Sequence, residues 1–248
     1  MVFAAGLGTR LRPLTNDRPK ALVELAGVPM LERVIKNLIR HGIDDITVNV
    51  HHFADKVIDF LASKQNFGVN IHISDERDLL LDTGGGILRA RQYLDGNEPF
   101  IVHNADILTD LNLTAMYQAH VEGGAEATLL TKWRQTQRYI LFDKTSRRMC
   151  GWVNKATGET RPDGFVYAPE HYDEFAFGGV HILSPTIFPY LEKYRQTLGN
   201  EVFGIMPFYI SMCQEALIQG YEGEDGYRWF DIGKPETLAL AEQALTIE

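Results

Sequence analysis

Apolar positions in the first part of the chain follow two alternating patterns. Short apolar runs, which are typical of buried strands, occur at 1–5, 46–50, 69–74 and 99–103. Between them, apolar residues recur at helical spacing over 30–39, 54–64 and 86–94, and Gly42 ends the first of these helices. Strands that alternate with helices of about ten residues predict βαβ units and a mostly parallel sheet. Ligands of such sheets bind beyond the carboxyl ends of the strands.

The pattern in the rest of the chain is less regular. It predicts strands at 125–131, 138–142, 174–183 and 229–232, and helices at 202–212 and 235–245. The segment 143–171 is rich in Gly, Pro, Lys and Arg, which favours hairpins and loops. Because no linker-like stretch divides the chain, we expect one domain over 1–248, with a regular front (1–131) and a closing part (132–248).

Composition and charge narrow the class of protein. The 248 residues carry a net charge of −9, which argues against non-specific nucleic-acid binding. No apolar run approaches the length of a membrane span, and the first residues do not form a signal peptide. The two cysteines, Cys150 and Cys213, form no CxxC pair, so we expect reduced thiols and a cytoplasmic protein. The first strand begins abruptly at Met1, so a natural start a few residues upstream stays open.

The loop after the first strand is rich in glycine and positive charge. Gly6 and Gly8 allow backbone N–H groups to approach a phosphate chain, and Arg10 and Lys20 add cations. Between positions 10 and 20 the local excess is +3, within a chain of net charge −9. The dinucleotide fingerprint fails because Leu11 occupies its last glycine position, and no Gly-Lys-Ser/Thr of a P-loop follows. The loop is therefore a candidate phosphate-binding segment of another type.

This loop resembles the signature of the sugar-1-phosphate nucleotidyltransferases, the NDP-sugar pyrophosphorylases. It reads Ala5-Gly-Leu-Gly-Thr-Arg-Leu-Arg-Pro-Leu-Thr15, followed by Pro19-Lys20 and Gly27-Val-Pro29. The resemblance implies an α/β fold of three layers, with a Rossmann-like (GT-A-like), mostly parallel sheet flanked by helices and an inserted β-rich region that binds sugar. Residues 1–131 would then bind the nucleotide, and 132–248 would bind the sugar and close the site.

The same resemblance implies roles for residues of the first loop. The backbone of Gly6, Leu7 and Gly8 would contact the base and the phosphates, with Ala5 and Thr9 beside them. Arg10 would hold the β- and γ-phosphates. Lys20 would hold the reacting α-phosphate and its developing charge, so we take Arg10 and Lys20 as the catalytic residues.

A second motif, Leu81-Asp-Thr-Gly-Gly-Gly-Ile87, precedes the predicted helix at 86–94. A glycine triplet before a helix is normally a loop or cap, but it also lets a planar base lie against the backbone. The motif resembles a segment of the N-acetylmuramate-1-phosphate uridylyltransferase subgroup. That resemblance implies base and ribose contacts by Thr83, Gly84 and Gly85, with Asp82 on the same nucleotide side, and it favours UTP. A plain helix cap is the alternative.

Two aspartates follow predicted strands. Asp106 ends the strand segment Phe100-Ile-Val-His-Asn-Ala-Asp106, and Asp231 lies in Trp229-Phe-Asp-Ile-Gly233. A carboxylate at a strand's carboxyl edge, opposite a phosphate loop, is placed to hold Mg²⁺, although each Asp alone is more often a turn former or cap. The resemblance covers both segments and implies that Asp106 and Asp231 share one catalytic Mg²⁺, with Asn104 on the nucleotide side.

The sugar side resembles the family less closely. Phe175-Ala-Phe177-Gly178-Gly179-Val180 is similar to the glycine-containing segment that lines the family's sugar pocket, and Gly151-Trp-Val-Asn154-Lys155 is similar to its Gly-Phe-x-Glu-Lys-Pro. Lys155 would contact the sugar phosphate, with Tyr139 and Asn154 on the sugar. Asn154 stands where many relatives have a sugar-binding Glu, and Ile140 stands where a glycine is common. These departures indicate a non-standard sugar, or a pocket rebuilt from Arg138 and the 157–171 loop.

The resemblance implies Mg²⁺-dependent transfer of a nucleotidyl group from an NTP to a sugar 1-phosphate, for nucleotide-sugar biosynthesis and the cell envelope. Alternatives within the enzyme class are a mannose- or heptose-1-phosphate guanylyltransferase and a phosphocholine-type cytidylyltransferase. A glycosyltransferase is disfavoured because the Asp106/Asp110 spacing is not Asp-x-Asp. A non-catalytic nucleotide-sugar-binding regulator also stays open. We expect no left-handed β-helix domain, no nucleic-acid or membrane partner, and a homodimer as a candidate assembly.

Overall fold

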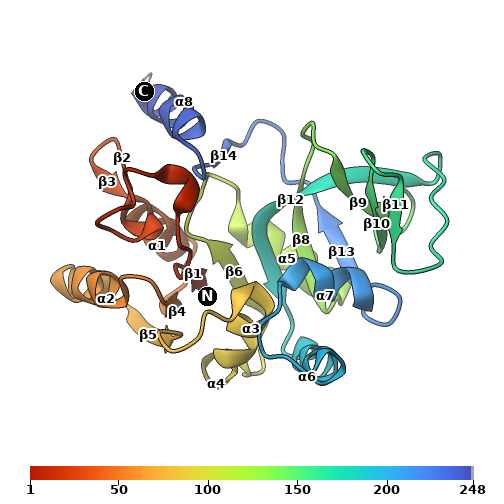
Figure 1. Cartoon of the computed structure of the whole chain (residues 1–248), viewed down its shortest axis with the longest axis horizontal. Coiled ribbons are helices and arrows are strands. Elements are labelled where there is room, and N and C mark those ends of the chain that lie inside the picture. Colours follow the sequence, from red (N-terminus) through yellow and green to blue (C-terminus); the bar gives the residue numbers. More distant parts are fainter. Residues whose placement is uncertain (247–248) are drawn as a thin grey trace. The chain divides into compact units, whose positions relative to one another are not determined.

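The computed structural model describes residues 1–246 and divides the chain into two compact units. Unit 1 contains residues 1–80, 102–113 and the segment from 224 onward. Unit 2 contains residues 81–101 and 114–223. Figure 1 shows both units, with helices and strands labelled where there is room. The expectation of one functional domain split at 131/132 stays a prediction.

Unit 1 contains a parallel sheet. Strand β1 (Val2–Phe3) pairs with β4 (Asp45–Val50) on one side and with β6 (Phe100–Asn104) on the other, and β5 (Asn70–Asp75) pairs with β4. The chain therefore extends the sheet from β1 toward β5 and later returns to place β6 at the other edge of β1. This reversal of strand order is the topological switch point at which α/β sheets bind ligands. The loops that follow β1 and β6 begin there.

The helices of unit 1 include α1 (Met30–Arg40) and α2 (Ala54–Ser63), which connect β1 to β4 and β4 to β5. The first loop contains two short 3₁₀ turns, η1 (Thr9–Leu11) and η2 (Lys20–Leu22), and a third, η3 (Gln65–Gly68), follows α2. Strands β2 (Glu24–Leu25) and β3 (Val28–Pro29) form a hairpin. Strand β7 (Ile107–Thr109) pairs antiparallel with β14 (Trp229–Asp231), and α8 (Pro235–Thr246) ends the described chain.

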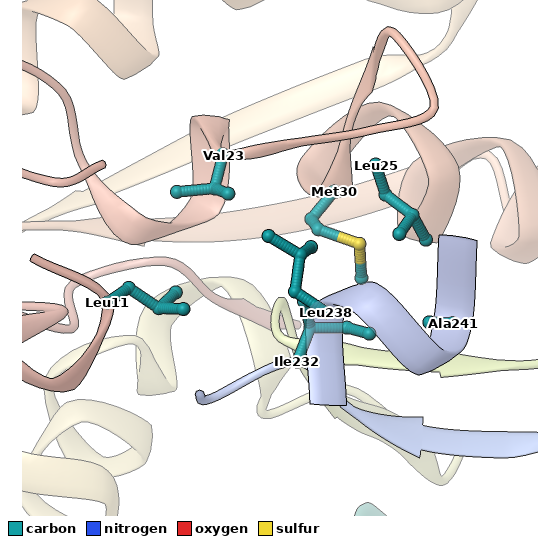
Figure 2. Close-up of a cluster of buried hydrophobic side chains, with 7 residues drawn as sticks. All are labelled: Leu11, Val23, Leu25, Met30, Ile232, Leu238 and Ala241. Carbon is teal, nitrogen blue, oxygen red and sulfur yellow. The ribbon is translucent and has the colours of Figure 1, made fainter. Parts of the chain in front are cut away.

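A buried cluster in unit 1 anchors the segments that carry Arg10, a predicted catalytic residue, and Asp231, a predicted metal ligand. Its members are Leu11, Val23, Leu25, Met30, Ile232, Leu238 and Ala241 (Figure 2). Leu11 directly follows Arg10, and Ile232 directly follows Asp231. Full burial of an aliphatic side chain stabilises the fold by about 1.5–3 kcal/mol. The buried side chains of Leu11 and Ile232 therefore hold the irregular segments around Arg10 and Asp231 in place.

Unit 2 contains a mixed, mainly antiparallel sheet in the order β11-β10-β9-β12-β8-β13. Its strands are β8 (Ala127–Lys132), β9 (Arg138–Asp143), β10 (Met149–Asn154), β11 (Glu159–Arg161), β12 (Tyr172–Leu183) and β13 (Ile218–Tyr221). Only the β8–β13 pair of this path is parallel. The helices are α3 (Asp82–Arg89), α4 (Arg91–Leu94), α5 (Leu113–Gly123), α6 (Ile187–Leu198) and α7 (Ile205–Met212), of which α5 begins one residue inside unit 1.

The predicted α/β fold with a mostly parallel, helix-flanked sheet and an added β-rich region is confirmed. The expected helix over 86–94 was placed wrongly, because helical structure already begins at Asp82 and breaks at Ala90. The expected helix over 202–212 begins only at Ile205, since residues 202–204 have no regular secondary structure and Gly204 is extended. Helices α5 and α6 were not predicted. None of the helices within residues 1–246 combines the length and the apolar character that crossing a membrane requires.

A buried histidine makes the stability of unit 2 sensitive to pH. His120 of α5 bonds through its two ring nitrogens to Thr128 (2.8 Å) and Ser184 (2.9 Å), and burial lowers its pKa from 6.5 to about 4. The unfolded chain therefore binds a proton below about pH 6.5 that the folded chain accepts only near pH 4. We expect the free energy of unfolding to fall by about 3 kcal/mol on this account as the pH drops through that window.

Urea unfolding of the wild type and of His120→Gln between pH 7.5 and pH 4.5 measures this effect. The variant, which has no titrating ring, is expected to lose less stability as the pH falls. Equal pH slopes in the two proteins would contradict this account.

Candidate functional site

The first loop begins from a fixed strand end. The Ala4 backbone N–H donates to the Asn49 side-chain oxygen (2.8 Å), and the Asn49 amide donates to the Glu76 carboxylate (2.8 Å). All three residues are buried. The strand end thus cannot shift without breaking a buried polar network, and leaving buried polar groups unpaired in a low-dielectric interior costs stability. Beyond this anchor Ala5 is still buried, whereas Gly6 and Leu7 are exposed.

Gly8 folds the loop back toward Lys20. Its φ of +64° lies in the left-handed region, and a Cβ at this position would lie 2.9 Å from the Thr15 methyl carbon and 3.0 Å from Lys20 Cβ. The Thr15 hydroxyl donates to the Gly8 carbonyl (2.8 Å) and closes the turn. Glycine is therefore required here for both conformation and space. The backbone of Gly6 and the side chains of Thr9 and Arg10 stay exposed beside this turn.

Lys20 and Asp106 form the central ion pair of the site. The Lys20 ammonium bonds to one oxygen of the Asp106 carboxylate, although 86 residues separate them in sequence. Their side chains are only 15% and 21% exposed. Asp106 follows β6 and Lys20 ends the loop that follows β1, so the pair lies where the switch point predicts a ligand.

Arg10 and Asp231 converge on Gly233. The Gly233 N–H donates to Asp231 Oδ1 (2.9 Å), and a Cβ on Gly233 would lie 2.7 Å from that oxygen and 3.1 Å from Arg10 Nη2. Asp231 also pairs with Ile107 across β14 and β7, and the Ile232 N–H donates to the Asp106 carbonyl (2.8 Å). The structure therefore brings the two predicted catalytic cations and the two predicted metal ligands into one unit. Sequence reasoning did not single out Gly233.

The two carboxylates fit a magnesium site. Mg²⁺ is usually held by one or two carboxylates together with phosphate and water oxygens. Asp106 and Asp231 would supply the carboxylates, and the segments that carry them are bonded to each other. Asp106 already accepts a cationic group, the Lys20 ammonium. No group of three or more His, Cys, Asp or Glu within the described residues could hold a metal ion. A cation at this site would thus depend on oxygens that a phosphate ligand brings.

His103 precedes Asp106 by three residues and carries no charge at neutral pH. It is buried in β6, and one ring nitrogen donates to the Asn104 carbonyl (2.8 Å). Burial lowers its pKa to about 4. The positive charge of the site therefore comes from Lys20, Arg10 and the other basic residues of the first loop.

The Asp82-Thr83-Gly-Gly-Gly motif is part of a helix rather than a loop before one. Gly84 and Gly85 are buried in α3, and their N–H groups donate to the Phe203 carbonyl (2.9 and 3.1 Å). The Thr83 hydroxyl accepts from the Ile205 N–H (2.8 Å), and Asp82 is exposed with a positive φ. These contacts connect α3 to the start of α7. The base contacts expected of Asp82, Thr83, Gly84 and Gly85 stay a prediction.

Gly84→Ala is expected to destabilise the protein by about 1–3 kcal/mol, the usual cost of overpacking. A Cβ on Gly84 would lie 2.5 Å from a Phe203 ring carbon and 3.0 Å from the Phe203 carbonyl oxygen. Gly96→Ala is the matched control, because nothing lies within 4 Å of a Cβ at Gly96 in the same unit. Urea denaturation measures both variants. If Gly84→Ala were as stable as Gly96→Ala, the close packing of α3 on the 201–205 segment would be contradicted.

Unit 2 contains a cavity of about 830 Å³ on one side of its sheet. The segments resembling the family's sugar region contribute Arg138, Trp152 and Phe177, and residues 161–163 close another side. Helices α6 and α7 contribute Tyr194, Met206, Pro207, Ile210 and Ser211. Arg138 and residues 161–163 of the 157–171 loop line the cavity, and a sugar pocket rebuilt from them stays a prediction. Tyr194 and Met206 were missed, because their helices are far away in sequence.

Other residues predicted for the sugar side lie elsewhere in unit 2. Tyr139 packs with Leu141 and Val153. Because successive residues of a strand point to opposite faces, Tyr139 faces away from the side to which Arg138 points. Lys155 pairs with Glu174 (2.5 Å) and lies over the Tyr139 ring. The structure therefore does not bring Tyr139 and Lys155 to the wall formed by Arg138.

The other three residues predicted to bind sugar are Asn154, Gly178 and Gly179, and each has a structural role in the backbone around it. The Asn154 side-chain oxygen accepts from the Ala156 N–H (3.0 Å). A Cβ on Gly178 would lie 2.7 Å from a Leu130 side-chain carbon, and Gly179 has a positive φ within an irregular stretch of β12.

Comparison with known proteins agrees with this geometry. The sequence profile of the family described as "Nucleotidyl transferase" matches residues 1–248. An N-acetylmuramate alpha-1-phosphate uridylyltransferase from Caulobacter vibrioides is 31% identical over 249 residues, which cover 99% of this chain and 96% of that protein. The catalytic subunit beta of a mannose-1-phosphate guanylyltransferase from Danio rerio is 29% identical over 241 residues, and the match covers 95% of this chain but only 61% of that protein.

Solved structures share the fold. HddC from Yersinia pseudotuberculosis, solved with GMP-PN, aligns with a TM-score of 0.72 at 22% identity, and the alignment covers 98% of this chain and 97% of that one.

Proposed function

Because the chain belongs to the nucleotidyl transferase family, we propose that it transfers a nucleotidyl group from UTP to a sugar 1-phosphate and releases pyrophosphate. The enzyme class, a sugar-1-phosphate nucleotidyltransferase, follows from the relatives. The observation that carries the reaction is the partly buried Lys20–Asp106 pair at the end of β1 and β6, beside a glycine loop.

The reaction brings together two anions, the sugar phosphate and the nucleoside triphosphate. An oxygen of the sugar phosphate attacks the α-phosphorus of the nucleoside triphosphate in line, the bond to the β-phosphate oxygen breaks, and pyrophosphate leaves. The nucleophile is already ionised, so no general base is required. The work of the protein is positioning and charge stabilisation.

The chain's own groups suit that work. The exposed backbone at Gly6 and Leu7 offers N–H groups to the phosphates, and Arg10 adds a guanidinium for the leaving pyrophosphate. Lys20 stabilises the charge that develops on the α-phosphate in a water-poor environment. Asp106 and Asp231 would hold Mg²⁺, which when bound supplies positive charge to the triphosphate.

UTP is favoured by the Asp82-Thr83-Gly-Gly-Gly motif and by the uridylyltransferase from Caulobacter vibrioides. The guanylyltransferase relative makes GTP with mannose 1-phosphate the second candidate. The proposal also includes a cytoplasmic enzyme of nucleotide-sugar biosynthesis, for which the free thiols of Cys150 and Cys213 suit a reducing compartment.

A pyrophosphate-release screen tests the proposal. UTP, GTP, CTP, ATP and dTTP are each combined with N-acetylmuramate, mannose and glucose 1-phosphates in the presence of Mg²⁺. We expect UTP to be the preferred nucleotide. Preference for GTP would favour the guanylyltransferase, and no release in any combination would exclude the proposed reaction.

A further inference from the structure

Lys155 lies on the face of the unit 2 sheet that points away from the cavity. Arg138 of β9 and Trp152 of β10 line the cavity. Tyr139 and Val153, their neighbours in the two strands, pack together in a buried cluster instead. The Lys155 ammonium lies over the Tyr139 ring, 5.4 Å from its centre. Because successive residues of a strand point to opposite faces, Lys155 is on the side of Tyr139 and not on the side of Arg138.

Glu174 of β12 holds the Lys155 ammonium on that face. One oxygen of the Glu174 carboxylate lies 2.5 Å from the ammonium, and the other accepts from the Tyr167 hydroxyl. The Tyr167 ring lies 5.9 Å from the same ammonium, so two aromatic rings flank it. The hydrogen bond to Glu174 raises the pKa of Lys155. The charge of Lys155 is therefore already balanced by a carboxylate, and its position is fixed by two rings.

The charged residues of the cavity are mainly cations. Arg134, Arg138 and Arg161 line it, against a single carboxylate, Asp163. Arg161 is neutralised by Glu159, whose carboxylate accepts from Arg161 Nε (2.8 Å) and Nη2 (2.7 Å). Within residues 1–246, no carboxylate forms an ion pair with Arg138. A guanidinium can bind a phosphate group through two parallel hydrogen bonds, which an ammonium cannot do.

The residue opposite Arg138 explains why its charge stays available. Arg138 of β9 and Asn154 of β10 are directly opposite in the antiparallel register. Opposite residues have Cβ atoms about 4.5–5.5 Å apart, so a carboxylate at 154 would form a cross-strand ion pair with Arg138. Asn154 is uncharged, and its side-chain oxygen accepts from the Ala156 N–H (3.0 Å). The exposed guanidinium of Arg138 is therefore available to an anion that enters the cavity.

We propose that Arg138, in place of Lys155, binds the phosphate group of the sugar substrate. This inference rests on the proposed transfer to a sugar 1-phosphate. The guanidinium donates paired hydrogen bonds to two of the phosphate oxygens, and the third oxygen stays free as the nucleophile. The cavity, of about 830 Å³, has room for the sugar ring beside Trp152 and Phe177. The family resemblance predicts Lys155 in this role, and the two assignments are separable by experiment.

Steady-state pyrophosphate release with UTP and the best sugar 1-phosphate of the screen tests the assignment. Arg138→Gln is expected to raise the KM for the sugar 1-phosphate about 10- to 100-fold, as for the loss of charge-assisted hydrogen bonds. The KM for UTP is expected to change less than about 3-fold, because Arg138 contacts the other substrate. Arg138→Lys, which keeps the charge but loses the paired geometry, is expected to lie between Arg138→Gln and the wild type.

Lys155→Gln tests the rival assignment. The inference predicts that it changes the KM for the sugar 1-phosphate by less than about 3-fold, since its ammonium is held by Glu174 on the other face. Lys193→Gln is the matched control, because Lys193 pairs with Glu215 at the same distance of 2.5 Å in the same unit. The control is expected to leave both KM values unchanged. Thermal unfolding confirms that each variant is folded.

The outcomes are distinct. A KM for the sugar 1-phosphate that rises in Arg138→Gln and not in Lys155→Gln supports the inference. A rise in Lys155→Gln that equals or exceeds the rise in Arg138→Gln would overturn it, as would an Arg138→Gln variant in which the KM for UTP rises equally. If the wild type released pyrophosphate with no sugar 1-phosphate of the screen, the proposed function itself would fail.

Discussion

Asp106→Asn is expected to reduce Mg²⁺-dependent pyrophosphate release to background while the protein stays folded. The substitution removes the carboxylate that would hold Mg²⁺, and it leaves the Lys20 ammonium, only 15% exposed, without its partner. Loss of one such charge from a preorganised site typically costs about 10²–10³ in kcat, and here two charged groups are affected. Steady-state pyrophosphate release over a Mg²⁺ titration, together with a circular dichroism spectrum, measures the effect.

Asp110→Asn is the matched control for this prediction. Asp110 lies in the same unit, and its exposed carboxylate pairs with Arg228 (2.7 Å). Exposed pairs of this kind contribute about 0–1 kcal/mol, so turnover in the control should be close to normal. Near-normal turnover in Asp106→Asn itself would remove Asp106 from the proposed site.

Lys20→Ala is expected to lower kcat by about 10²–10³ and to raise the KM for UTP by a smaller factor. The reason is that the charge on the α-phosphate grows in the transition state, so a cation there stabilises the transition state more than bound UTP. Steady-state kinetics with varied UTP separates the two parameters.

Lys36→Ala, which removes an ammonium paired with Glu32 on α1, is the control for the loss of a lysine. A raised KM with an unchanged kcat in Lys20→Ala would make Lys20 a residue that binds ground-state nucleotide only.

The parallel part of the fold, and the edge of its sheet where Lys20 and Asp106 meet, could be predicted from the sequence. Short apolar runs and helical periodicity gave β4, α1 and α2 within one or two residues, since burial on both faces leaves a strong local signal. Glycines after a strand with Arg10 and Lys20 indicated a phosphate loop. The structure adds the reason that the loop needs Gly8, which is the approach of Thr15 and Lys20.

Other features depend on contacts that no local pattern reveals. Gly233 matters because Arg10, more than two hundred residues earlier, reaches the same point as Asp231. Strand alternation turns Tyr139 to the opposite face from Arg138, and the sugar contacts expected of Tyr139 and Lys155 stay a prediction. The glycine triplet at 84–86 was placed before a helix, whereas the packing of Phe203 on Gly84 places it inside α3.

The transfer of the α-phosphate tests the central claim most directly. Wild-type protein is incubated with UTP labelled at its α-phosphate, Mg²⁺ and the best sugar 1-phosphate of the screen, and the products are separated. The account predicts that the label appears in the UDP-sugar, with one pyrophosphate released for each molecule formed. Label that appears only in UMP or UDP, or that stays in UTP with every sugar 1-phosphate, would contradict it.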